Sequence, residues 1–142
     1  MFRIAAIDHI VLRTAHLDRM LAFYVDVLGC EVERELPPEK GLIQLRAGNA
    51  LIDLVPTDSE MGRKGGEAPA ATGRNLDHFC LLLEPLSEQE ILDYLHSKGI
   101  EGGEFMERYG AEGMGRSVYI EDPDGNTVEL RARQDASALS WV

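Results

Sequence analysis

The chain has 142 residues, of which 44% are hydrophobic, and its 25 acidic and 14 basic side chains give a formal net charge of −11. This length suits one substantial core, or two small related modules that share one. The charge has the wrong sign for nucleic acid or an anionic membrane surface, and the sequence shows neither a signal-peptide pattern nor a long apolar run. We therefore expect a soluble, cytoplasmic protein with no nucleic-acid or membrane partner.

The first half of the chain predicts the element order βαβββ. The segment IDHIVLR, residues 7–13, is rich in β-branched residues and too short for a helix, so we expect a strand. Apolar residues at helical spacing then predict a helix over 17–28, ended by Gly29. Turn residues separate three more expected strands at 30–35, 42–46 and 50–55.

The second half predicts the same order again. Residues 57–75 are rich in Gly, Ala and polar residues without an apolar period, which predicts a connection. LDHFCLLL at 76–83 then predicts a strand, and Ser87 and Glu90 have the spacing of a capping box at the start of a helix. Three further strands are expected at 100–108, 116–121 and 126–131, with a DPDG turn at 122–125.

We therefore expect a single α+β domain over 1–142 that contains two βαβββ modules. The two Asp-His segments are separated by a similar number of residues as the two strand carboxylates Asp53 and Glu129, as a duplicated module requires. The expected parts are module 1 at about 4–56, the connection at 57–75, module 2 at about 76–133 and a tail at 134–142.

Four side chains suggest a metal site. His9 and His78 lie in the first strand of each module, while Asp53 and Glu129 lie within apolar runs of the last strands. A buried carboxylate without a partner is costly. If the first and last strands are neighbours and a pseudo-twofold axis relates the modules, two imidazoles and two carboxylates converge on one divalent ion. Taken singly, each histidine could be a hydrogen-bonded strand residue and each carboxylate could face water.

These segments together resemble a known family. IDHIVLR, AFYVDVLG, LDHFCLLL and IEDPDGNTVELR are similar to segments of the vicinal oxygen chelate superfamily, the glyoxalase / bleomycin-resistance / extradiol dioxygenase group. The resemblance covers about residues 4–133 and implies that the two modules form a curled mixed sheet, a half-barrel, around a metal. It implies that His9, His78 and Glu129 are ligands. In glyoxalase I a glutamate occupies the position of Asp53, so the shorter aspartate is a departure.

The resemblance implies a metal-dependent lyase or isomerase of the glyoxalase I type, also called the lactoylglutathione lyase type. Glu129 would be the base and Asp53 the second candidate. The metal would be Ni, Co, Zn, Mn or Fe, the substrate a small molecule with neighbouring oxygens, and the protein a homodimer. The alternatives are an extradiol ring-cleaving dioxygenase and a thiol transferase of the fosfomycin-resistance type. A non-catalytic drug-binding protein is a further alternative, against which the ligand set argues.

Other residues carry weaker signals. Arg13 lies four residues after His9 on the same strand face, so it could bind a substrate carboxylate or lie exposed at the strand end. The glycine-rich segment at 108–116 could be a mobile lid or a plain connection, with Arg116 and Tyr119 as substrate-binding candidates.

The two cysteines, Cys30 and Cys80, stand in apolar surroundings and form no Cys-x-x-Cys pair. This pattern predicts buried, reduced thiols.

Overall fold

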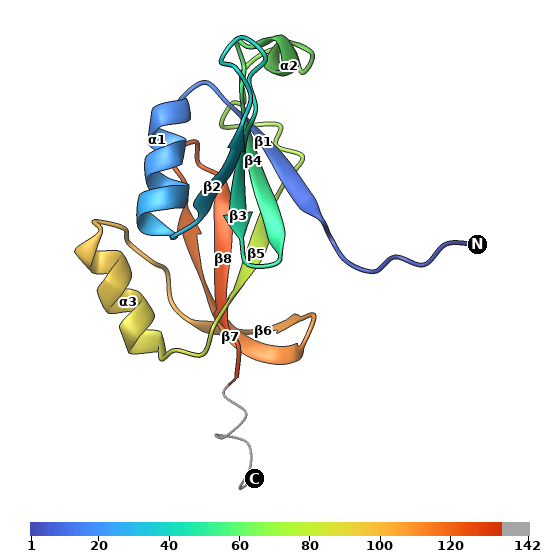
Figure 1. The fold of residues 1–142 in the computed structure, drawn as a ribbon. Helices are drawn as coiled ribbons and strands as arrows, with labels where there is room; N and C mark the ends of the chain where they lie inside the picture. Colours follow the sequence, from blue (N-terminus) through green and yellow to red (C-terminus); the bar gives the residue numbers. More distant parts are fainter. Residues whose placement is uncertain (135–142) are drawn as a thin grey trace, which may run out of the picture. The chain divides into compact units, whose positions relative to one another are not determined.

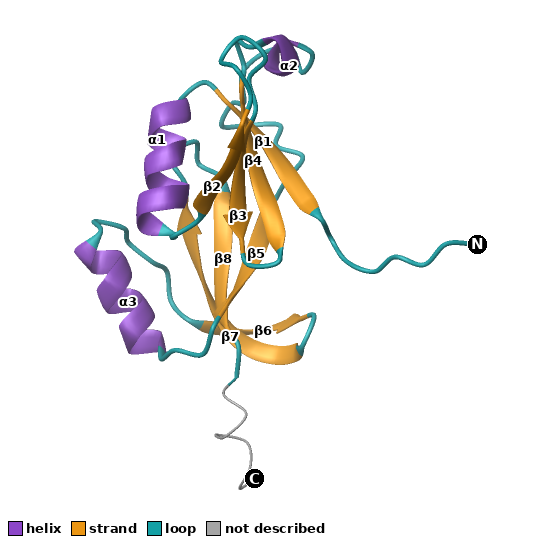
Figure 2. Ribbon diagram, in the orientation of Figure 1, coloured by secondary structure: helices purple, strands orange, loops and turns teal. Residues whose placement is uncertain are grey.

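The computed structural model describes residues 1–134, so the predicted tail lies outside the described residues from position 135 onward. The chain divides into two compact units, Met1–Arg74 and a second that begins at Asn75. Each unit contains an open four-stranded sheet (Figures 1 and 2), which confirms the two predicted βαβββ modules. No helix in the described part of the chain is long and apolar enough to cross a membrane.

The first unit has the strand order β1-β4-β3-β2. Its first and last strands, β1 and β4, are parallel neighbours, and the other two pairs are antiparallel. Its elements are β1 (His9–Thr14), α1 (Leu17–Leu21), η1 (Ala22–Val27), β2 (Glu31–Glu35), β3 (Ile43–Ala47), β4 (Ala50–Pro56) and α2 (Glu60–Arg63).

The predicted helix over 17–28 is present, but its second half is a π-helix. The α-helix α1 continues directly into η1, where the amide of Leu28 donates to the carbonyl of Phe23, five residues earlier. Phe23 and Tyr24 are both buried and pack edge to face, with ring centroids 5.0 Å apart. Both rings therefore lie on the buried face of this helix. The helix ends at Gly29, which has φ 81°, as predicted.

The connection predicted at 57–75 contains a short helix that the sequence pattern did not predict. In α2 the Ser59 side chain accepts a hydrogen bond from the amide of Gly62 at 3.1 Å, which is an N-cap. Gly62 also lies against the carbonyl of Pro56, where a Cβ would collide. A helix of four residues is too short to show apolar periodicity, so a local cap and a close backbone contact define it.

The second unit has the strand order β5-β8-β7-β6, again with the first and last strands as parallel neighbours. The predicted capping box is present, since Ser87 and Glu90 exchange side-chain and backbone hydrogen bonds at the start of α3. The elements are β5 (His78–Leu83), α3 (Glu88–Ser97), β6 (Met106–Gly110), β7 (Gly113–Glu121) and β8 (Thr127–Ala132).

Two predictions about the middle of this unit are wrong. The strand expected at 100–108 begins only at Met106, after a segment that contains Gly102 and Gly103. The segment at 108–116 is not a plain connection, because most of it belongs to the β6–β7 hairpin, in which Gly110 pairs with Gly113, and its role as a lid stays a prediction. Glycine-rich sequence indicated a loop, whereas Gly110 and Gly115 lie in strands where the side chain of Arg131 packs on them, as described below.

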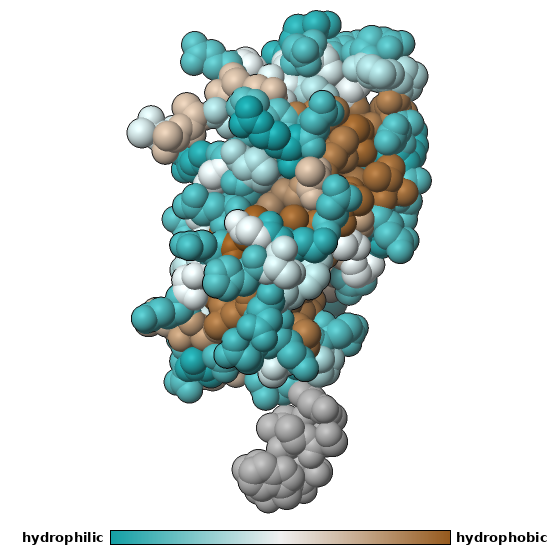
Figure 3. Space-filling model, turned by 90° about the vertical axis from the view of Figure 1, so that its left-hand side faces the viewer, coloured by the Kyte–Doolittle hydropathy of each residue, from teal (hydrophilic) through white to brown (hydrophobic). Residues whose placement is uncertain are grey.

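The turn at 122–125 is formed as predicted. Oδ1 of Asp122 accepts hydrogen bonds from the amides of Asp124 and Asn126, each at 2.9 Å, and Gly125 has φ 80°. The turn returns the chain from β7 into β8. On the face shown in Figure 3, hydrophilic side chains cover much of the surface, with hydrophobic areas between them.

Candidate metal centre

Each unit places one histidine and one carboxylate on neighbouring strands, and the offset between them is the same in both units. In the parallel pair β1–β4, His9 aligns with Leu51, two residues before Asp53. In β5–β8, His78 aligns with Thr127, two residues before Glu129. Aligned residues share a face and faces alternate along a strand, so each imidazole lies on the same side of its sheet as the carboxylate. The condition set by the metal-site hypothesis, that the first and last strands of each module are neighbours, is therefore met in both units.

Both imidazoles are held at Nδ1 by the aspartate that precedes them. Oδ2 of Asp8 lies 2.7 Å from Nδ1 of His9, and Oδ2 of Asp77 lies 2.6 Å from Nδ1 of His78. A carboxylate at Nδ1 leaves Nε2 as the nitrogen for a metal and fixes the ring orientation. The repeated Asp-His dipeptide was the sequence signal for this arrangement, but sequence reasoning assigned no role to the two aspartates.

The hydrogen bond from Asp8 also raises the pKa of His9 above its ordinary value of 6.5. Partial loss of solvation opposes this effect, and the negative charge of Asp53 adds to it. Asp53 is therefore near enough for its charge to favour the protonated form of His9.

Asp53 is the more unusual of the two carboxylates. It is 2% exposed, and its Oδ2 accepts a hydrogen bond from Nε2 of Gln44 at 3.2 Å. Its Oδ1 is buried and has no hydrogen-bond partner among the described residues. A buried carboxylate oxygen without a partner is costly, and a bound cation would offset that cost. The donor chemistry of this pair therefore fits a divalent metal.

Glu129 is 6% exposed, and its Oε1 lies 3.2 Å from Nε2 of His78. In the second unit an imidazole nitrogen and a carboxylate oxygen thus lie within hydrogen-bonding distance. This pair of ligand atoms suits Ni, Co, Zn, Mn or Fe. Within residues 1–134, the structure gathers no group of three or more His, Cys, Asp or Glu side chains that could hold a metal. The convergence of all four predicted ligands stays a prediction.

Tyr119 lies beside the second pair. It aligns with Glu129 across β7 and β8, and its ring centroid is 5.3 Å from that of His78. The guanidinium carbon of Arg108 lies 4.0 Å from the centre of the Tyr119 ring. The structure therefore places this substrate-binding candidate next to two predicted ligands.

The two arginines predicted to bind substrate are occupied by their own chain. Nε, Nη1 and Nη2 of Arg13 donate to the carbonyls of Gly62, Glu67 and Gly66 at 3.1, 3.0 and 2.6 Å. Arg116 donates through Nε and Nη2 to the carboxylate of Glu88 at 2.9 to 3.1 Å. Both arginines serve structural contacts in this state, and a role in substrate binding stays a prediction.

The cysteine prediction is confirmed for Cys30 and wrong in part for Cys80. Both thiols are free, and Cys30 is buried, with a pKa raised by burial. Cys80 is exposed on β5, where it aligns with Glu129. Loss of solvation at the sulfur, followed by the charge of Glu129, raises the pKa of Cys80 to about 11, while Arg131 and Arg108 oppose this rise. Sequence reasoning missed these two arginines.

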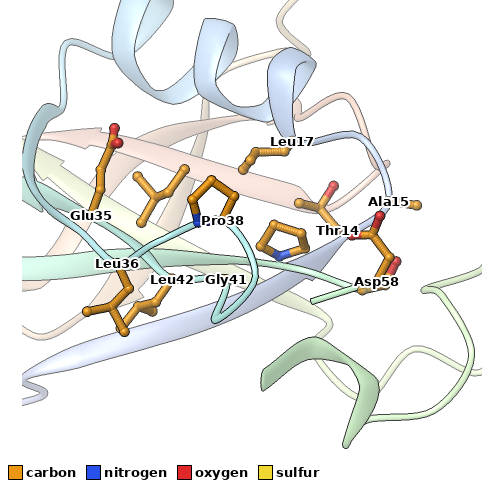
Figure 4. A pocket seen from close by; sticks show the side chains of 12 residues that line it. Thr14, Ala15, Leu17, Glu35, Leu36, Pro38, Gly41, Leu42 and Asp58 are labelled. Atoms are coloured by element: carbon orange, nitrogen blue, oxygen red, sulfur yellow. The ribbon is translucent and has the colours of Figure 1, made fainter. Parts of the chain in front are cut away.

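Two cavities lie elsewhere in the units. The first, of about 530 Å³, lies beyond the end of β1 between the start of α1 and the β2–β3 connection (Figure 4), where Thr14, Leu17 and Pro38 are among the lining residues. None of the predicted metal ligands lines it. The second, of about 580 Å³, is lined by Gly99–Gly103 and by residues that include Tyr119 and Thr127. The paired ligands therefore lie outside both cavities.

Comparison with known families agrees with this geometry. The family model for the Glyoxalase/Bleomycin resistance protein/Dioxygenase superfamily matches residues 6–130. The chain belongs to this superfamily. The matched residues include all four predicted ligands, so the paired strands described above lie within the part of the chain that the family model covers.

Superfamily relatives with different activities are similar to this chain. Lactoylglutathione lyase GLX1 of Arabidopsis thaliana is 29% identical over 133 residues, which cover 88% of this chain and 43% of that protein. Biphenyl-2,3-diol 1,2-dioxygenase 3 of Rhodococcus globerulus is 31% identical over 134 residues, which cover 87% of this chain and 60% of that protein. The chain thus spans less than two thirds of the length of either relative.

Solved structures of similar chain length match this chain almost end to end. Integron cassette protein VCH_CASS1 from V. Cholerae has a TM-score of 0.72 and 26% identity, and the match covers 94% of this chain and 99% of that one. Lactoylglutathione lyase from Agrobacterium tumefaciens has a TM-score of 0.64 and 26% identity, over 96% and 97% of the two chains.

Proposed function

We propose that the chain is a divalent-metal-dependent enzyme of the glyoxalase I type, a lyase or isomerase acting on a small substrate with neighbouring oxygens. One observation carries the proposal. Two parallel strand pairs hold a histidine and a buried carboxylate in the same register, and an aspartate orients each histidine through Nδ1. Duplication alone could repeat a structural histidine, but here each histidine is accompanied by a buried carboxylate, and Oδ1 of Asp53 has no hydrogen-bond partner among the described residues. The named lyase relatives support the same class of reaction.

In this proposal His9, Asp53, His78 and Glu129 hold the metal, with each unit supplying one nitrogen and one carboxylate ligand. When bound, the metal would act as a Lewis acid on the adjacent oxygens of the substrate. We further propose a cytoplasmic homodimer, in which the two halves of a site come either from one chain or from two.

Glu129 moves the proton. Its carboxylate is almost fully buried and lies beside Nε2 of His78, which keeps it oriented. A carboxylate held in this way can take a proton from one substrate carbon and return it to the neighbouring carbon. Asp53 is the second candidate for this role, because its Oδ1 has no partner among the described residues. Tyr119, beside His78, would orient the substrate.

Ring cleavage of a catechol is the second candidate function. Two histidines and one carboxylate form the facial triad of iron dioxygenases, and a dioxygenase relative is as similar to the chain as the lyases are. In that reaction Asp53 would not be required.

A paired assay separates the two functions. The purified chain is stripped of metal, reloaded with Ni, Co, Zn, Mn or Fe(II), and assayed on a hemithioacetal and on a catechol. We expect metal-dependent isomerisation of the hemithioacetal, lost in Glu129→Gln. Ring cleavage with iron alone would favour the dioxygenase, and inactivity with both substrates and all metals would contradict the enzyme proposal.

A further inference from the structure

Two arginines of the second unit lie on the same sheet face as the His78–Glu129 pair. Arg131 is two residues after Glu129 in β8, so both side chains project from one face. Ser117 aligns with Arg131, and Tyr119 aligns with Glu129. Arg108 of β6 shares this face, because its guanidinium bonds Ser117 and covers the Tyr119 ring. The charges of both arginines also reach Cys80.

Arg131 has an unusual environment for a charged side chain. It is 7% exposed, and its Nη2 donates to the carbonyls of Arg108 at 2.6 Å and Gly113 at 3.0 Å. A Cβ at Gly110 or Gly115 would collide with the guanidinium. The β6–β7 hairpin therefore has glycine where this group needs room, which explains why a glycine-rich segment forms strands here.

Arg108 is also held by neutral groups. Its Nη1 donates to the carbonyl of Ser117 at 2.7 Å and to the Ser117 hydroxyl at 2.9 Å. Its guanidinium stacks over Tyr119, a contact that favours a cation and fixes its plane. No carboxylate among the described residues forms an ion pair with either Arg108 or Arg131.

Each of the two guanidiniums therefore has hydrogen-bond donors without an acceptor among the described residues. In each, one terminal nitrogen makes all the hydrogen bonds, while Nε and the other terminal nitrogen have no acceptor among the described residues. Arg13 provides the contrast, since all three of its nitrogens donate to carbonyls. Nε and one terminal nitrogen form the fork that binds a carboxylate or phosphate through two oxygens.

We infer that Arg108 and Arg131 bind an anionic oxyacid group of the substrate, a carboxylate or a phosphate, next to the atoms held at His78 and Glu129. The inference rests on the proposed function and narrows its substrate class to small acids whose anionic group adjoins the neighbouring oxygens. It assigns the anion to two arginines other than Arg13 and Arg116.

The test uses the full chain without metal, with ¹⁵N-labelled arginine, titrated separately with inorganic phosphate and with pyruvate. We expect the Nε–Hε resonances of Arg108 and Arg131 to shift together along one saturation curve with at least one of the probes. Arg108→Gln should weaken that binding by about 10-fold or more, because it removes a charge-assisted hydrogen-bonding fork. A stronger response to pyruvate identifies a carboxylate, and a stronger response to phosphate identifies a phosphate.

Arg46→Gln is the matched control, since Arg46 lies in the other unit and pairs with Glu33 on the surface. It should bind the probe as the parent does. Arg131→Gln should weaken binding as Arg108→Gln does, and Arg131→Lys, which keeps the charge but loses the fork, replaces it if Arg131→Gln does not fold. Binding that is unaffected by Arg108→Gln in a folded protein, or no response to either probe, would overturn the inference. Because no metal or turnover is involved, failure here is distinguishable from failure of the proposed enzyme activity.

Discussion

Nε2 of His78 lies 3.2 Å from Oε1 of Glu129, across two parallel strands that are the first and last of their unit. Without a metal, a proton on the imidazole can satisfy this carboxylate. A metal ion would replace that proton, because it needs a neutral imidazole and an ionised carboxylate. Proton and metal therefore compete for the same two atoms, and the first unit offers His9 and Asp53 in the same register.

Removing His78 should remove most of the metal. We expect the purified parent to retain about one divalent ion per site, and His78→Ala to lose most of it while it remains folded, because a site that lacks one ligand binds weakly. Elemental analysis measures the metal and circular dichroism the fold. His96→Ala, at an exposed position near the end of α3, is the control and should keep its metal. Full occupancy in His78→Ala would exclude His78 as a ligand.

Asp53 distinguishes the two candidate reactions. For a glyoxalase-type enzyme, Asp53→Ala should weaken metal binding and slow isomerisation by roughly 10²–10⁴-fold, the range for loss of a proton-transfer group or its partner. Asp53→Glu should keep or raise the activity, since it restores the longer carboxylate. For a dioxygenase, His9, His78 and Glu129 suffice and metal content should hardly change. Unchanged metal affinity and isomerase activity in Asp53→Ala would rule out the four-ligand model.

Metal should leave as the solution is acidified through the histidine range. The hydrogen bond from Asp8 raises the pKa of His9 above 6.5, so this imidazole holds a proton at a higher pH than an ordinary histidine. Competition with metal therefore begins above pH 6.5 and grows as the pH falls. Equilibrium dialysis at a series of pH values measures the retained metal. Constant retention down to strongly acid solution would count against both histidines.

Cys80 reports on the charges around Glu129 without any metal. With a pKa of about 11, its thiolate fraction at pH 8 is about one in a thousand, so iodoacetamide should modify it slowly although the residue is exposed. Glu129→Gln should lower this pKa and speed modification, whereas Arg131→Gln should slow it. Peptide mass spectrometry measures the rate at Cys80. Glu121→Gln, at the end of β7, is the control and should react as the parent does.

Arg13 should hold the segment after α2 in place. Its three hydrogen bonds to the carbonyls of Gly62, Gly66 and Glu67 tie this segment to β1. We expect Arg13→Ala to increase hydrogen exchange and protease cleavage within 57–75 while the sheets keep their protection. Unchanged exchange in this segment would show that the three hydrogen bonds do not restrain it.

The sequence predicted the parts of the fold that repeat and the parts with strong local signals. The duplicated order βαβββ, the capping box at Ser87 and the turn before β8 all follow from residue spacing or turn chemistry. The pairing of the first and last strands was a condition of the metal-site hypothesis, and the structure meets it in both units. The burial of both carboxylates agrees with that reasoning.

The features that the sequence did not predict depend on contacts between distant residues. The helix α2 is defined by a cap at Ser59 and a close contact at Gly62, neither of which produces a periodic pattern. The β6–β7 hairpin looked like a loop because its glycines make room for Arg131, which lies far along the chain. Arg13 was selected because it lies four residues after His9 on one strand face, but sequence does not show that all three of its nitrogens donate to carbonyls or that two nitrogens of Arg131 have no acceptor among the described residues.

The position of β4 and β8 within their sheets bears on how each unit folds. Each is the last strand of its unit to leave the ribosome, yet it lies in the interior of the sheet, between the first and third strands. In each unit the carboxylate lies more than forty residues after the histidine, so the two come together only when a long loop has closed, which carries an entropic cost. Each half of the proposed metal centre is thus assembled only when its sheet is complete, so a chain that stalls before this strand pairs would have no His–carboxylate pair with which to bind an ion.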